Sequence, residues 1–215
     1  MIHDQWLRWL VTGLSMLSAA EWANVIATRR RAWRFIVSYT LHLVMAIAMA
    51  VMAWPFSAHL PTTGPAVFFL FAAAWFVTVT IAWAPTAARR VLRCYHALMM
   101  LAMAWMYAVL NGHILPGQSG EGQPAEAPTM SMPGMDMGPT ATDVTASSGP
   151  PGWITAVNWF WFVGFVVAAA VWTYLVVAQR RKPATNRRRR LLYGAGQAMM
   201  AAGMAIMFAS MVFQV

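Results

Sequence analysis

The sequence predicts an all-α polytopic membrane protein with six transmembrane helices arranged as three helical-hairpin repeats. The chain is 60% apolar and only 10% charged, which is typical of integral membrane proteins. Six apolar segments are each long enough to cross a bilayer, and almost all of the basic residues gather in alternate loops between them. We therefore expect a chain that lies within a lipid bilayer.

The six apolar segments are separated by polar, Gly- and Pro-containing or basic loops. Each has the length of about 20 residues that a helical span requires. No basic region precedes the first segment and no small-residue cleavage site follows it, so we expect an uncleaved helix there rather than a signal peptide. The segments run over residues 6–27, 34–55, 65–83, 91–112, 155–178 and 191–213.

Basic residues set the predicted orientation. Of the 15 Lys and Arg residues, 14 lie at 29–34, 89–93 and 180–190, in the loops after the first, third and fifth segments. The positive-inside rule places these loops in the cytoplasm and both termini outside, in a plasma membrane. The net charge of +9 is then a topology signal, with anionic lipid headgroups as the nearest partner and no nucleic acid.

The same organisation divides the chain into three parts. Residues 1–113 hold the first two hairpins and residues 153–215 hold the third. Residues 114–152 are rich in Gly, Pro, Ser and Thr and lack apolar periodicity, so we expect an external flexible loop. The single cysteine, Cys94, lies at the cytoplasmic end of the fourth segment, where we expect a buried free thiol.

The second, fourth and sixth segments share one pattern. A His or Gln is followed by Met at offsets of 3, 7 and 10, and by a second His or Gln at offset 17. The first four positions fall within about 80° of one helix face, so each stripe presents a polar head and three thioethers. We predict three related helices that run in the same direction. The stripes are His42, Met45, Met49 and Met52 with His59; His96, Met99, Met103 and Met106 with His113; and Gln197, Met200, Met204 and Met207 with Gln214.

Methionine at helical spacing has two interpretations. It is a flexible apolar residue that fills gaps between helices, and its thioether is also a soft, neutral ligand that suits Cu(I). Packing does not explain a cluster in the polar external loop, where there is no core. Its MxMxxMxM spacing resembles the Met-rich segments of extracytoplasmic copper-handling proteins. The cluster consists of Met130, Met132, Met135 and Met137.

The histidines add imidazole ligands to the thioethers. His42 and His96 lie in the cytoplasmic half of their segments and are either metal ligands or hydrogen-bonded interhelical contacts. His59 and His113 lie at the outer ends, as candidate outer ligands or as water-exposed interfacial side chains. Glu21 has a depth similar to that of His42, so it is a candidate His42 partner, as a structural pair or in a proton relay.

Copper handling competes with other functions. The leading hypothesis is an integral plasma-membrane protein that captures Cu(I) with the external loop and moves or delivers it along the first two stripes. The third stripe would contribute less to such a path, because it begins with Gln197 and Gln is a weak ligand for a soft metal. A non-metal scaffold or accessory subunit, with the stripes as packing faces, is the alternative. The two hypotheses differ in whether the stripes face one another or face lipid or a partner.

A b-type haem with His42 and His96 as axial ligands is a lesser alternative, because bulky Leu43, Val44 and Leu98 follow the histidines. The sequence contains no HExxH, GxSxG, P-loop or dinucleotide fingerprint, so we expect no enzymatic activity. Expected partners are the lipid bilayer, copper-handling or other membrane proteins, and a second copy in a homo-oligomer.

Three sequence segments carry a family resemblance. They are HLVMAIAMAVMAWP at 42–55, YHALMMLAMAWMYAVLNGH at 95–113 and QAMMAAGMAIMFASMVF at 197–213. With these segments the chain resembles an actinobacterial family of multi-pass integral membrane proteins classed as a domain of unknown function. The resemblance implies a membrane location and a helical architecture, and it brings no activity or site residues with it.

Overall fold

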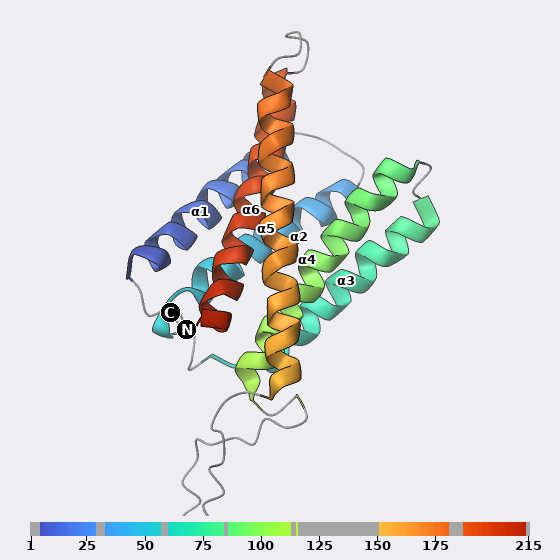
Figure 1. The fold of residues 1–215 in the computed structure, drawn as a ribbon. Helices are drawn as coiled ribbons and strands as arrows, with labels where there is room; N and C mark the ends of the chain where they lie inside the picture. The colour runs from blue at the N-terminus through green and yellow to red at the C-terminus, as the bar shows by residue number, and fades with distance from the viewer. Residues whose placement is uncertain are drawn as a thin grey trace, which may run out of the picture.

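A computed structural model describes residues 5–28, 33–56, 60–83, 86–112, 115, 151–180 and 187–213. Its regular elements in these residues are all α-helices, which confirms the all-α class, and each lies within a few residues of a predicted apolar segment (Figure 1). The helices are α1 (Gln5–Thr28), α2 (Trp33–Met52), α3 (Thr63–Trp83), α4 (Ala87–Asn111), α5 (Gly152–Arg180) and α6 (Arg187–Phe213).

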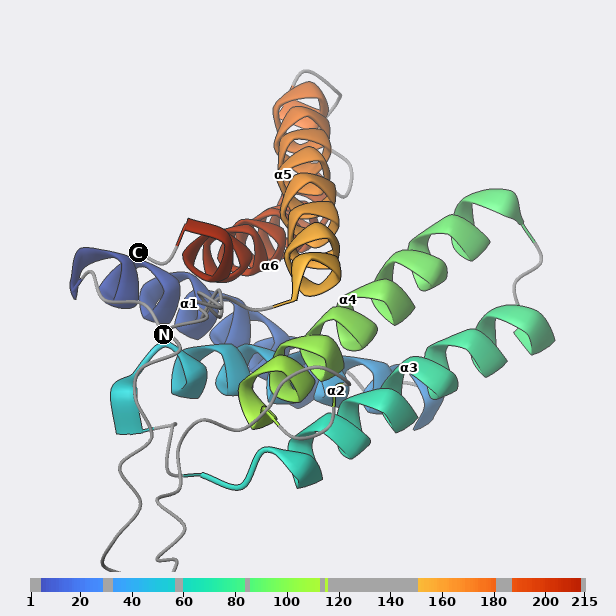
Figure 2. The same cartoon turned by 60° about the horizontal axis from the view of Figure 1, so that its bottom comes forward.

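Consecutive helices pack side by side, α1 on α2, α3 on α4 and α5 on α6 (Figures 1 and 2). α6 also packs on α1 and α2, and so joins the first pair to the last. The odd-numbered helices run in one direction and α2, α4 and α6 run in the other, towards the end of the molecule where both termini lie (Figure 1). This arrangement gives the three helices that carry the stripes the same direction.

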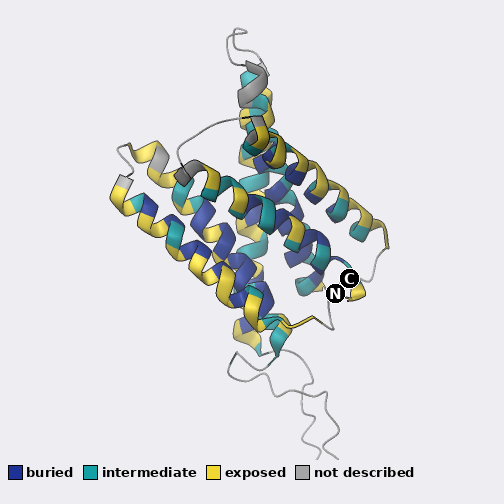
Figure 3. Ribbon diagram, turned by 180° about the vertical axis from the view of Figure 1, so that it is seen from behind, coloured by how far each residue is buried: buried dark blue, intermediate teal, exposed yellow. Residues whose placement is uncertain are grey.

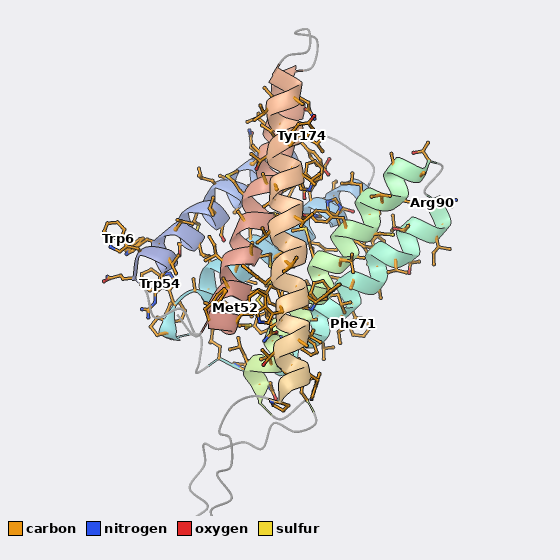
Figure 4. All side chains as sticks on the ribbon, in the orientation of Figure 1. Trp6, Met52, Trp54, Phe71, Arg90 and Tyr174 are labelled. Carbon is orange, nitrogen blue, oxygen red and sulfur yellow. The ribbon has the colours of Figure 1, made fainter. Side chains whose placement is uncertain are left out.

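Four helices contain stretches that are long and apolar enough to cross a membrane: Thr63–Ala82, Arg90–Asn111, Gly152–Gln179 and Leu191–Phe213. α2 contains a shorter apolar stretch, Ile36–Met52. Buried residues gather where the helices face one another (Figure 3). Many large apolar residues lie exposed on the outer surface. Phe71 and Tyr174, for example, project outwards from α3 and α5 (Figure 4).

Hydrogen bonds join the two helices of a pair near their ends in the first two pairs. Near the end of α2, Trp54 donates its indole N–H to Thr12 Oγ1 at 3.2 Å and meets the Trp9 ring edge-on, with ring centroids 5.3 Å apart. At the opposite end of the molecule, Arg93 on α4 donates to the carbonyl oxygen of Val79 on α3 at 2.7 Å. These bonds set the register within the first two pairs.

The prediction of a buried thiol is wrong, because Cys94 is exposed and free. Its position on the helix explains the difference. His96 faces the interior, and a residue two positions away on an α-helix points about 200° around the axis, to the opposite side. The thiol therefore lies on the outer face of α4.

Two glycines allow α6 to lie close to its neighbours. A Cβ atom at Gly196 would collide with Oε2 of Glu21 on α1, and a Cβ at Gly194 would come within 2.8 Å of Val176 Cγ2 on α5. Small residues permit this close approach of helix backbones. The Glu21 carboxyl group consequently occupies a notch in the surface of α6.

We expect Gly196→Ala to lower the free energy of unfolding by about 1–3 kcal/mol, because the added methyl group overpacks the contact with Glu21. Glu21→Ala in the same chain should restore most of the loss. Gly203→Ala is the matched control, since a Cβ there meets only Met49 Sδ at 3.9 Å. Unfolding of the detergent-purified variants by heat or by SDS measures the three effects, and equal effects at both glycines would contradict this account.

Candidate functional site

The three predicted stripes meet in the interior of the bundle. Every polar head and every methionine of the stripes that the structure describes is buried, and none is more than 7% exposed. The even-numbered helices therefore turn their sulfur-bearing faces towards the core and away from the surrounding medium (Figure 3). The residues are His42, Met45, Met49 and Met52 on α2; His96, Met99, Met103 and Met106 on α4; and Gln197, Met200, Met204 and Met207 on α6.

The polar heads of the stripes form one layer, which we call the His–Gln layer. The rings of His42 and His96 meet edge-to-face, with centroids 4.4 Å apart and planes at 83°. The Gln197 side chain lies beside His96. Three helices that are far apart in sequence thus bring two imidazoles and one amide to the same level of the bundle.

The orientation of His42 is fixed by its own helix. Its Nδ1 lies 2.6 Å from the carbonyl oxygen of Ser38, one turn earlier on α2. Because a carbonyl oxygen can only accept, this bond assigns the proton of the neutral ring to Nδ1 and leaves a lone pair on Nε2. Nε2 is buried and makes no hydrogen bond. His42 therefore presents a free nitrogen ligand inside the bundle.

Other atoms of the His–Gln layer also lack partners. By distance and angle, Nε2 of His96 and both Oε1 and Nε2 of Gln197 are buried without a hydrogen bond, although the Gln197 side chain lies close enough to His96 and Tyr193 to interact with each of them. Each buried polar group left unpaired costs about 1–3 kcal/mol of stability, and native structures keep few of them. Four such atoms belong to this layer, and others lie at Ser15, Ser18 and Tyr95.

An aromatic shell surrounds the layer. The Phe76 ring centroid lies 5.6 Å from the centroids of both His42 and His96. Trp22 lies 5.1 Å from His42, and Tyr95 lies 5.7 Å from His96. The shell limits access of water to the imidazoles, so charge interactions within it are stronger than in water.

The third stripe reaches the same region through Met200. Its Sδ accepts a hydrogen bond from the indole N–H of Trp22 at 3.3 Å, and Met200 follows Gln197 by one helical turn. The metal ligands predicted on the helical stripes belong only to the first two stripes, because Gln197 replaces a histidine in the third. The structure buries all three stripes alike and places a thioether of the third beside Trp22, whose ring contacts that of His42.

Glu21 was predicted as a partner of His42, but its neighbours in the structure lie on α6. Its carboxyl group lies against Gly196 and interacts with Tyr193 on α6. His42 bonds Ser38 through Nδ1, and its Nε2 has no hydrogen bond, so the structure contains no Glu21–His42 hydrogen bond. The next residue on α1, Trp22, occupies the place beside His42.

Several predicted site residues lie outside the described residues. These include the candidate outer ligands and the whole methionine cluster of the external loop, so the capture step stays a prediction. The residues are His59, His113, Met130, Met132, Met135, Met137 and Gln214.

The donor set constrains which cofactor could fit. Within the described ranges, no three His, Cys, Asp or Glu side chains gather around one point, so a metal in the layer would need thioether ligands beside the two imidazoles. The 4.4 Å between the His42 and His96 rings leaves no space for a macrocycle between them. His42 and His96 are therefore too close together to be the two axial ligands of one haem.

The comparisons with known proteins agree with the resemblance seen in the sequence. The model of a family described as a domain of unknown function (DUF5134) matches residues 34–211. The chain is 53% identical, over the full length of both chains, to uncharacterized proteins of Mycobacterium bovis and of two strains of Mycobacterium tuberculosis. No solved structure matches it.

We expect Gln197→Leu to raise the free energy of unfolding of the metal-free protein by about 1–3 kcal/mol, because it removes two buried polar atoms that lack partners. Asn158→Leu is the control. The Asn158 amide is also buried, but its Oδ1 accepts a hydrogen bond from Trp105 at 2.8 Å, so its loss should destabilise the fold. Thermal unfolding in detergent compares the two variants. Destabilisation of equal size in both would mean that Gln197 has a structural role.

Proposed function

The chain belongs to the family described as a domain of unknown function (DUF5134), and we propose that it is an integral membrane protein that binds Cu(I) at the His–Gln layer. His42 and His96 supply nitrogen ligands, and the surrounding stripe methionines supply thioethers. Imidazole and thioether together suit a soft monovalent ion. The role proposed is binding and movement of the ion, without enzymatic chemistry.

The observation that carries this proposal is the meeting of the stripes around unpaired imidazole nitrogens. Copper handling requires the stripes to face one another, whereas a scaffold could turn them towards lipid or a partner protein. Packing alone also accounts for buried methionines. It does not account for two histidines and a glutamine whose buried polar atoms lack partners in the same layer. A bound ion would satisfy both nitrogen atoms.

The methionines beyond the layer supply a route for the ion. Along each stripe the polar head and the three thioethers recur every three or four residues over ten positions, which is about 15 Å of helix. Met49 Sδ lies near the backbone of α6 at Gly203, so the stripes of α2 and α6 remain close midway along the bundle. Successive weak sites of this kind favour movement over trapping. In this proposal the methionine cluster of the external loop captures Cu(I), and His59 and His113 bind it next.

We also propose the membrane arrangement that the sequence predicts. All six helices span the plasma membrane as three hairpin repeats, with the arginine loops in the cytoplasm and both termini and residues 114–152 outside. The exposed apolar outer faces of the helices support contact with lipid. The direction shared by α2, α4 and α6 supports placing the loops before them on one side (Figure 1).

Cu(I) binding to the detergent-purified protein tests the proposal, with anaerobic reduction and competition by a chelator of known affinity. We expect His42→Leu combined with His96→Leu to weaken Cu(I) binding at least about 100-fold, the effect of losing about 2.7 kcal/mol. Met103→Leu should weaken it less. Met16→Leu is the control, because Met16 lies on the exposed surface of α1 and belongs to none of the stripes.

A second variant, with Met130, Met132, Met135 and Met137 changed to Leu or Ser, separates capture by the loop from binding in the bundle. Loss of Cu(I) binding in the histidine variant, with the Met16→Leu protein unchanged, would support the site. Binding no tighter than that of an unrelated membrane protein would refute copper handling and leave the stripes as packing surfaces of a scaffold.

Cys94 tests the orientation, since it is the only cysteine of the chain and is exposed. A membrane-impermeant maleimide should label it in inside-out vesicles and not in right-side-out vesicles. Ser131→Cys in a Cys94→Ser background should show the opposite pattern, because residue 131 lies in the external loop of the proposal. Labelling of Cys94 in right-side-out vesicles would reverse the proposed topology.

A further inference from the structure

Trp22 lies at the centre of the contacts between α1, α2 and α6, and it is only 2% exposed. Its ring centroid is 5.1 Å from that of His42, with the planes at 41°. Its indole N–H donates to Met200 Sδ at 3.3 Å. One side chain therefore contacts a polar head from the first stripe and a thioether from the third.

Two further aromatic rings hold the indole in this position. Tyr39 on α2 stacks on it at a centroid distance of 5.4 Å, and Tyr193 on α6 meets it edge-on at 5.7 Å. With ring contacts on these sides and a hydrogen bond at Nε1, the orientation of Trp22 is determined by its surroundings. A preorganised wall of this kind favours binding because little is left to order when the ligand arrives.

The chemistry of indole explains what such a wall can do. Its nitrogen carries a proton and can only donate, so Trp22 cannot be a nitrogen ligand in the usual sense. Its ring face attracts cations, and indole is the best of the aromatic side chains in this respect. Its hydrogen bond to Sδ also engages one side of the Met200 thioether, which fixes where that sulfur points.

We propose that Trp22 forms a wall of the ion site in the His–Gln layer. It positions the Met200 thioether through its N–H and contacts the bound ion through its ring. An ion held between His42 Nε2 and Met200 Sδ lies beside the indole, because both residues contact Trp22. An apolar ring suits an ion that has shed its water, so the site takes a soft monovalent cation, Cu(I) or Ag(I), in preference to a hydrated divalent ion. This inference rests on the proposed function.

The test titrates Ag(I) into the detergent-purified protein and follows bound metal and tryptophan emission in parallel. In the wild-type protein, we expect emission to change in step with binding. In Trp22→Phe, Ag(I) should still bind, about 2- to 30-fold more weakly, as the usual size of a cation–π contact predicts. Most of the emission change should be lost with the indole.

Trp172→Phe is the matched control. Trp172 on α5 contacts Tyr95 and Tyr193, each at a centroid distance of 6.1 Å, so it flanks the layer one shell further out. This variant should keep both the affinity for Ag(I) and the emission change. Loss of the emission change in Trp172→Phe, with its retention in Trp22→Phe, would overturn the assignment.

The outcomes separate the inference from the function on which it rests. A wild-type protein that binds neither Ag(I) nor Cu(I) refutes the proposed function. A wild-type protein that binds Ag(I), with unchanged affinity and emission change in Trp22→Phe, refutes only the role of Trp22. If Trp22→Phe does not fold, Trp22→Tyr, which keeps an aromatic ring, takes its place in the same titration. In wild-type protein, a hundredfold excess of Zn²⁺ should not displace Ag(I), and displacement would overturn the preference for a monovalent ion.

Discussion

The structure depends on how three polar heads are kept inside an apolar bundle. Two imidazoles and an amide cost little at a wet surface, but they are costly where water does not reach. The bundle accommodates them by placing His42, His96 and Gln197 at one level and surrounding them with aromatic rings. Only the His42 ring gains a backbone hydrogen bond. The rest of the layer is left as a polar region within a core of thioethers, alanine and phenylalanine.

Periodicity predicted the elements and the faces of individual helices well. Apolar runs located all six helices, and the offsets of 3, 7 and 10 identified the faces of α2, α4 and α6 that the structure buries. These are properties of one helix at a time, set by 3.6 residues per turn. Cys94 was misassigned because its place at a helix end received more weight than its place on the helical wheel.

What the sequence could not predict is which residue of one helix meets which residue of another. Equal depth suggested Glu21 as the partner of His42, but the rotation of α1 presents Trp22 there and turns Glu21 towards Gly196. Phe76 had no distinguishing pattern, being one aromatic residue in an apolar helix. Met200 was discounted on the identity of the residue heading its stripe, although its burial depends on helix packing. Only the glycines at 194 and 196 hinted at where α6 makes its closest contacts.

The attachment of His42 to Ser38 has a mechanical consequence. Because the anchor lies one turn back on the same helix, the imidazole rotates and tilts with α2 as a rigid unit. His96 belongs to α4, which packs mainly with α3. The separation of the two Nε2 atoms therefore reports the relative position of two helix pairs. A ligand that bridges these atoms binds one arrangement of the two helix pairs more tightly than others. Binding of a ligand in the layer therefore shifts the position of α2 against α4, and a shift of these helices changes the affinity for the ligand in return.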